Sequence, residues 1–163
     1  MQPMTTVRNW QLDMLRKNLK VVGHIVENTS QADASTYRDS GDGWTVVEVV
    51  CHLRDWEILF LERARMTMTQ EFPTLPNPNP TEAALEREYN TQNLQSVYAE
   101  WQRNRDLFLN FLDSIAETDW ERAADHPVRG HFTLNDQLLL TAWHDVNHIE
   151  QITHILDERK PHR

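Results

Sequence analysis

The sequence predicts an all-α fold, a four-helix bundle that forms a single domain over residues 1–163. Two observations lead to this prediction. Four long segments lack proline and are rich in helix formers such as Leu, Glu, Gln, Arg and Ala, and the helix breakers gather between these segments. The expected helices span about residues 5–29, 45–70, 82–115 and 134–159.

Start signals support two of these helices. Thr45 is followed three residues later by Glu48, and Thr133 is followed three residues later by Asp136. A Thr at the cap and an acidic side chain at this distance can satisfy two backbone N–H groups of the first turn. The segments between the helices, including the proline-rich residues 73–80, are expected to be irregular connections.

Composition limits the classes of function. The chain is 39% hydrophobic and 25% charged, which is an ordinary globular balance. Its formal net charge of −9 opposes binding to nucleic acid and to anionic membranes. No apolar run reaches the length of about 18 residues that a membrane span needs. The single cysteine, Cys51, fits a reducing cytoplasm. We therefore expect a cytoplasmic protein that binds neither nucleic acid nor a membrane.

A pair of histidines marks the fourth expected helix. His144 and His148, in "TAWHDVNHIEQI", share one helix face because they are four residues apart and each residue advances about 100°. Such a pair either binds a metal or packs in the core beside hydrogen-bonding neighbours. A third ligand would favour the metal. His52 lies among apolar residues of the second expected helix, where it either has a buried partner or binds a ligand.

Two segments, "WTVVEVVCHLRDWE" and "HFTLNDQLLLTAWHDVNHIEQI", resemble the DinB/YfiT-like superfamily of four-helix-bundle metalloenzymes. The resemblance covers nearly the whole chain and implies that His52, His144 and His148 bind one divalent metal ion. Three neutral imidazoles suit Zn²⁺ first, and also Ni²⁺ or Fe²⁺, whereas Ca²⁺ and Mg²⁺ prefer oxygen ligands. Three protein ligands leave open positions, as in catalytic zinc sites.

The same resemblance implies a function. Characterised members are thiol-dependent enzymes, including bacillithiol transferases and a mycothiol-dependent maleylpyruvate isomerase, and members are commonly homodimers. We therefore expect a metal-dependent transferase that joins a low-molecular-weight thiol, as cosubstrate, to an electrophilic small molecule. Two alternatives remain: a metal-dependent hydrolase, and a stress-related metal-binding protein without turnover.

Four further polar residues lie close to these positions in the sequence. Asp55, one turn after the histidine of the second helix, is the predicted catalytic residue, as general base or as partner of a ligand's second N–H; the alternative is a solvated helix charge. Gln151 lies within roughly 60° of His144 on the helix and could orient a ligand or bind substrate. His126 and His131 precede the fourth helix and are expected to be solvated, although either could act at the mouth of the site.

Overall fold

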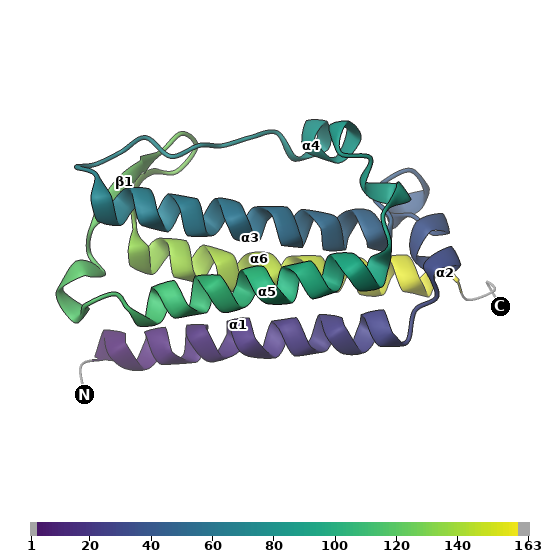
Figure 1. Ribbon diagram of the computed structural model, residues 1–163, viewed down its shortest axis with the longest axis horizontal. Coiled ribbons are helices and arrows are strands. Elements are labelled where there is room, and N and C mark those ends of the chain that lie inside the picture. Colours follow the sequence, from purple (N-terminus) through teal and green to yellow (C-terminus); the bar gives the residue numbers. More distant parts are fainter. Residues whose placement is uncertain (1–2, 160–163) are drawn as a thin grey trace.

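The computed structural model describes residues 3–159. Four long helices lie side by side as a bundle (Figure 1), namely α1 (Pro3–Glu27), α3 (Val46–Thr69), α5 (Leu94–Asp113) and α6 (Leu134–Asp157). Each packs mainly against two others, in the order α1, α5, α3, α6 and back to α1. The predicted all-α four-helix bundle is therefore confirmed. No helix in the described part of the chain combines the length and the apolar character that crossing a membrane requires.

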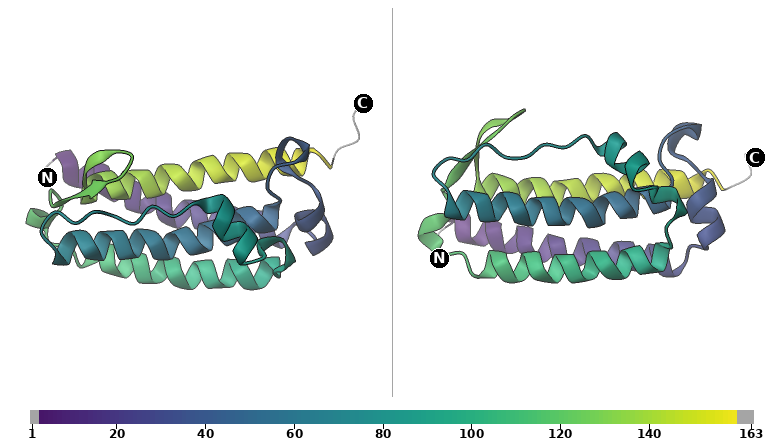
Figure 2. Two further views of the ribbon diagram at one scale, coloured as in Figure 1. Left: turned by 90° about the horizontal axis from the view of Figure 1, so that it is seen from above. Right: turned by 45° about the horizontal axis from the view of Figure 1, so that its top comes forward.

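The helices do not alternate in direction along the chain. Figure 1 shows α3 and α5 both running from right to left, whereas α1 and α6 run from left to right. Between α3 and α5 the chain must therefore return along the length of the bundle. It does so in residues 70–93, which we call the crossover segment, and Figure 2 shows this segment running along the side of the bundle that α3 and α6 form. The segment contains α4 (Pro80–Glu86) and the short 3₁₀ helix η2 (Tyr89–Thr91).

The single helix predicted over residues 82–115 is wrong. The chain leaves helical geometry at Glu88, where φ is +47°. The next α-helix, α5, begins only after Asn93, whose side chain accepts the backbone N–H of Ser96. Asparagine is a favourable cap because it supplies a partner for an otherwise unpaired N–H of the first turn. This break allows the chain to turn from the crossover segment into α5.

Small elements connect the long helices where plain loops were expected. An antiparallel hairpin precedes α6, and its register places Ala123 opposite Thr133 and His126 opposite Gly130. The remaining short elements are α2 (Gln31–Thr36), η1 (Asp39–Gly41), η3 (Glu117–Asp119), and the hairpin strands β1 (Ala123–His126) and β2 (Gly130–Thr133). Strands of four residues are too short for a clear alternation of polar and apolar residues, which is why the sequence does not reveal them.

The hairpin also fixes the crossover segment. The backbone N–H of Leu75 donates to the carbonyl of Asp125 at 2.9 Å, and the N–H of Asp125 donates to the carbonyl of Pro73 at 2.8 Å. Residues 73–79 are thus irregular, as predicted, and these two hydrogen bonds attach them to β1. Together the hairpin and the crossover segment form a cover over one side of the bundle (Figure 2).

Both predicted capping boxes are present. Thr45 accepts the N–H of Glu48 and the Glu48 side chain accepts the N–H of Thr45, at the start of α3. Thr133 and Asp136 do the same at the start of α6. A cap of this kind contributes about 1 kcal/mol to helix stability. These two caps fix where α3 and α6 begin, and therefore which of their residues face each other.

The core consists of two large clusters of buried apolar side chains. On α6, Leu138 and Ala142 belong to one cluster, and Ile152 and Ile155 belong to the other. The stretch of α6 between the two clusters carries the predicted histidine pair. A polar site between the two clusters therefore interrupts neither of them.

Candidate metal centre

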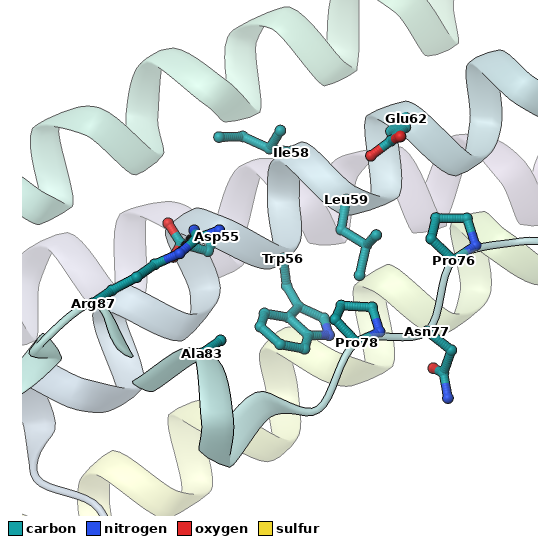
Figure 3. A pocket seen from close by; sticks show the side chains of 10 residues that line it. All are labelled: Asp55, Trp56, Ile58, Leu59, Glu62, Pro76, Asn77, Pro78, Ala83 and Arg87. Carbon is teal, nitrogen blue, oxygen red and sulfur yellow. Dashed lines mark hydrogen bonds and ion pairs between the residues drawn. The ribbon is translucent and has the colours of Figure 1, made fainter. Parts of the chain in front are cut away.

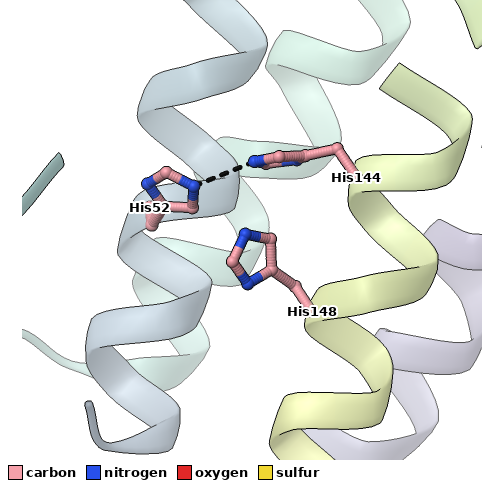
Figure 4. A group of neighbouring side chains, drawn as sticks. All are labelled: His52, His144 and His148. Atoms are coloured by element: carbon pink, nitrogen blue, oxygen red, sulfur yellow. Dashed lines mark hydrogen bonds between the residues drawn. The ribbon is translucent and has the colours of Figure 1, made fainter. Parts of the chain in front are cut away.

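The three predicted histidines meet between α3 and α6 (Figure 4). One ring nitrogen from each of His52, His144 and His148 lies within 4.8 Å of the other two. The Nε2 atoms of His52 and His144 are 2.9 Å apart. The ring centroid of His148 is 4.7 Å from that of His52 and 4.4 Å from that of His144. The structure thus brings the three side chains together, and their role as metal ligands stays a prediction.

Aromatic side chains surround this histidine cluster. The ring of His52 packs against those of Trp44 and Trp56, with centroids 5.0 and 4.1 Å away. Phe60 packs its ring nearly perpendicular to that of His144, with centroids 5.2 Å apart. Such packing restricts the rotation of the imidazoles and keeps water away from part of the site.

Burial keeps all three imidazoles neutral. Burial, together with the smaller effect of the neighbouring His148, lowers the pKa of His52 to about 2. Burial also lowers the pKa of His144 well below its ordinary value, with His148 and His52 as the next causes. The pKa of His148 is lowered by burial too, although its hydrogen bond with Gln151 acts in the opposite direction. Neutral imidazoles are the form that binds metal ions.

A hydrogen-bonded chain orients His148. The Nδ1 of His148 lies 2.8 Å from Oε1 of Gln151, and Nε2 of Gln151 donates to Oδ2 of Asp39 at 3.0 Å. A carbonyl oxygen only accepts hydrogen bonds, so Nδ1 carries the proton and Nε2 keeps its lone pair. Figure 4 shows that this second nitrogen points toward the other two rings. Gln151 thus makes the contact expected of a residue that orients a ligand.

Sequence analysis missed Asp39 at the end of this chain. It belongs to η1, between α2 and α3, and nothing in the local pattern connects it with helix α6. Gly43 makes the tight turn there possible, because a Cβ at this position would lie 2.6 Å from the Asp39 carbonyl oxygen. The link to Gln151 exists only through the tertiary fold.

The histidine cluster fits one divalent ion. Two imidazole nitrogens bound to the same zinc at about 2.0–2.1 Å are about 2.9–3.4 Å apart, and the His52–His144 pair falls at the lower end of that range. A hydrogen bond within this pair would leave the Nε2 lone pair of His148 without a donor among the described residues. A cation can accept lone pairs from all three nitrogens at once. The donor set and the geometry therefore agree.

Asp55 lies one turn beyond His52, but its carboxylate takes part in a different network. It accepts from Arg54 Nε at 2.8 Å, from Arg87 Nη1 at 2.6 Å and from the Tyr89 hydroxyl. Its side chain is only 8% exposed, so the alternative of a solvated charge is wrong. Asp55 lines a cavity of about 620 Å³ between α3 and the crossover segment, where Figure 3 shows Arg87 reaching its carboxylate. Its catalytic role stays a prediction.

The two loop histidines differ from each other. His126 is 1% exposed, so the expectation that it is solvated is wrong. It lies at the end of β1, and its Nδ1 accepts the N–H of Val128. His131 is exposed, as expected, and its ring lies 5.8 Å from that of Phe72. Neither belongs to the histidine cluster formed by the described residues.

The fold and the histidine cluster define a helical-bundle protein whose polar site is built from side chains of facing helices, an arrangement typical of metal sites in such bundles. A sequence model of the DinB superfamily matches residues 13–152. The chain therefore belongs to the DinB superfamily. The resemblance seen in the sequence alone is thereby confirmed.

Individual relatives agree with this assignment. The chain is 30% identical over 132 residues to "Putative metal-dependent hydrolase YfiT" of Bacillus subtilis strain 168, covering 80% of this chain and 72% of the relative. The solved structure of YfiT, described as a probable metal-dependent hydrolase with an unusual four-helix bundle topology, matches with a TM-score of 0.84 at 24% identity. That match covers 93% of this chain and 86% of YfiT.

Two more distant structures share the fold. A mycothiol-dependent maleylpyruvate isomerase matches with a TM-score of 0.75 at 12% identity, over 93% of this chain and 63% of the isomerase. The colibactin self-resistance protein ClbS, solved in complex with double-stranded DNA, matches with a TM-score of 0.67 at 12% identity, over 92% of this chain and 95% of ClbS. At these identities the likeness concerns the fold alone. The expectation that this chain does not bind nucleic acid stays a prediction.

Proposed function

We propose that this protein is a metal-dependent enzyme that transfers a low-molecular-weight thiol to an electrophilic small molecule. The observation that supports it most is the convergence of three neutral imidazoles beside a cavity. His52, His144 and His148 hold one divalent ion, with Zn²⁺ as the first expectation and Ni²⁺ or Fe²⁺ as alternatives. A metal ion with an open position supplies Lewis-acid chemistry, which favours the thiolate form of a thiol near neutral pH.

The cavity beside His144 favours a thiol over water as the nucleophile. Its described lining includes aromatic, apolar and basic side chains but no carboxylate. A metal ion held by the three histidines would lower the pKa of bound water and of a bound thiol, and a thiol, whose ordinary pKa is far lower than that of water, would depend less on a carboxylate as general base. The thiol would release its proton to solvent, its sulfur would form the bond to the electrophilic carbon, and the leaving group would depart with the bonding electrons. Trp56 and Phe60 give this reaction an apolar wall.

Hydrolysis is the second candidate, because the relatives are named metal-dependent hydrolases. In that case we propose Asp55 as the general base, acting from the larger cavity that it lines. Asp55→Asn should then lower kcat for a hydrolysed substrate by about 10²- to 10⁴-fold. Glu62→Gln, which alters another carboxylate of the same cavity, is the matched control. Equal kcat values for Asp55→Asn and wild type would exclude this role.

Two measurements test the proposed function. Elemental analysis of protein purified without a metal-affinity tag should give about one divalent ion per chain, as expected for a single three-histidine site. The metal-loaded protein should then accelerate the addition of bacillithiol, mycothiol or glutathione to a haloaromatic or an epoxide. The metal-free protein and His144→Ala should not. Absence of turnover with every thiol would reject the transferase and favour hydrolysis or metal binding alone.

We also propose that two copies of the chain form a homodimer. Leu139, Trp143 and Val146 form an exposed apolar stripe on α6, with exposed fractions of 54%, 58% and 43%. A contiguous stripe of this kind indicates an interaction surface, unlike scattered apolar residues. Light scattering coupled to size-exclusion chromatography should give the mass of a dimer for wild type and of a monomer for Val146→Glu. A monomeric wild type at micromolar concentration would contradict the proposal.

A further inference from the structure

The cavity beside His144, described above, also carries a group of basic side chains. Its volume is about 240 Å³, and its walls come from α3, α6, the crossover segment and the hairpin. His144 is part of this wall, so a molecule in the cavity touches the histidine cluster. The same wall contains Arg63, His126 and Arg129, three basic side chains in a protein whose formal net charge is −9.

Arg63 is a buried cation without a carboxylate partner. It lies on α3 and is 3% exposed. Its Nε and Nη2 donate to the Pro76 carbonyl at 2.9 and 2.7 Å, and Nη2 donates to Asn77 Oδ1 at 3.2 Å. These acceptors are neutral, and no hydrogen bond of Nη1 exists within the described residues. Burial and the charge of Arg129 lower the pKa of Arg63 to about 10, which reflects the missing counter-charge.

Arg105, which is buried more deeply still, shows what Arg63 lacks. Arg105 has two carboxylate partners, Glu57 and Asp145, within 3.1 Å of its guanidinium nitrogens. A buried charge is normally paired in this way because leaving it unpaired costs several kcal/mol. Arg63 therefore has the charge and free N–H groups of a residue whose partner is an anion from outside the chain.

His126 and Arg129 also lack a hydrogen-bond acceptor. The Nδ1 of His126 accepts the N–H of Val128 at 3.2 Å, so the proton of this neutral imidazole is on Nε2. Nε2 lies 3.4 Å from Nη1 of Arg129. Two donors then face each other without an acceptor. An anionic oxygen placed beside both would accept a hydrogen bond from each.

Nearby carboxylates do not fill this position. Asp125 acts on the pKa of His126, and Glu62 acts on that of Arg63, each in the direction opposite to the basic neighbours. Neither forms an ion pair with Arg63 or Arg129 in the described part of the chain. The basic cluster thus remains open to a ligand from the cavity side.

We propose that Arg63, His126 and Arg129 bind a carboxylate group of the substrate and thereby hold its reactive part next to His144. A guanidinium fork matches the two oxygens of a carboxylate, which gives orientation as well as attraction. Trp56 and Trp143 border the same cavity and accommodate an apolar portion of the molecule. The proposal rests on the proposed function only in that it calls the bound anion a substrate.

The test uses metal-free protein, so that it does not depend on turnover. Succinate, propionate and inorganic phosphate are titrated at constant ionic strength, with tryptophan fluorescence and calorimetry as readouts, because Trp56 and Trp143 lie in the cavity wall. Wild type should bind succinate saturably and more tightly than phosphate. Arg63→Gln and Arg129→Gln should each weaken succinate binding about 10-fold or more, because each removes a charged donor. Arg65→Gln, whose guanidinium lies over Phe111, is the matched control and should bind like wild type.

Each outcome supports or overturns the proposed carboxylate-binding site. Tighter binding of phosphate than of succinate overturns the carboxylate assignment. Equal affinity for succinate in wild type and in both Gln variants overturns the subsite itself. Arg129 is exposed, so Arg129→Gln remains informative even if Arg63→Gln fails to fold. Carboxylate binding without thiol turnover would reject the proposed function and keep the subsite, whereas turnover without carboxylate binding would do the reverse.

Discussion

Replacing His148 with alanine is expected to abolish stoichiometric binding of a divalent ion while the bundle stays folded. The variant removes one of three convergent ring nitrogens, and two imidazoles alone do not form the three-ligand set typical of catalytic zinc sites. The fold should survive because the apolar clusters lie on either side of the histidine cluster along α6 and lose no side chain. The measurements are metal content by elemental analysis and far-ultraviolet circular dichroism.

Two matched variants sharpen this prediction. His154→Ala removes an exposed histidine of the same helix and should bind metal like wild type. Gln151→Leu keeps all three rings but removes the acceptor of the His148 Nδ1–H, so the metal affinity should fall by about 10- to 100-fold. A chelator competition assay would rank the four proteins. Full metal content in His148→Ala would contradict the assignment of the ligands.

Thermal melts add a second readout. A ligand present at about 100 times its dissociation constant stabilises the folded state by about 2.7 kcal/mol. Added zinc should therefore raise the melting temperature of wild type and of His154→Ala, but not that of His148→Ala. A metal-free wild type that is unfolded would show that the ion is structural, and this would remove the main support for an enzyme.

The helices that carry the site were predictable because their signals are local. The capping boxes of Thr45 and Thr133 fix the starts of α3 and α6, and helical periodicity then places the histidines. The direction of α5 relative to α3 was not predictable, since periodicity is the same in both directions. The break at Glu88 was missed because the residues before it are good helix formers, although Asn93 is a recognisable cap.

The site could be predicted only in part for a similar reason. The spacing of His144 and His148 is a property of one helix, and the resemblance supplied His52. Arg63 follows His52 at helical spacing through Trp56 and Phe60, so its place on that face was readable from the sequence. Arg129 reaches the same cavity as Arg63 only because the hairpin packs over the bundle. Contacts between distant segments leave no local pattern.

Replacing Arg105 with methionine should have the largest effect on stability. Arg105 is fully buried and contacts all the long helices from its place in α5: Glu57 of α3, Asp145 of α6 and the Leu15 carbonyl of α1. Trp101 also donates to Glu57 at 3.0 Å. Without the guanidinium, two buried carboxylates would share a site with no cation. Breaking a buried ion pair in this way costs about 3–5 kcal/mol, a large part of the 5–15 kcal/mol that stabilises a typical domain.

The charges of this buried network predict that two substitutions within it differ in their effect on stability. One cation and two carboxylates leave a net negative charge, and burial raises the pKa of Asp145 to about 6. Because this folded-state pKa lies above the unfolded value of 3.8, the folded state binds the proton more tightly. Ionisation of Asp145 therefore lowers stability as the pH rises from about 4 to about 6. Asp145→Asn removes the excess charge and should cost far less than Arg105→Met.

Urea unfolding at several pH values would measure both effects. At neutral pH, Arg105→Met should lose several kcal/mol of unfolding free energy, whereas Asp145→Asn should lose at most about 1–2 kcal/mol, the value of altered hydrogen bonds. Between pH 7 and pH 5 the wild type should gain stability relative to Asp145→Asn, because only the wild type can protonate this side chain. If the two variants were equally destabilised, the stability of the core would depend on the hydrogen bonds of the network rather than on its balance of charge.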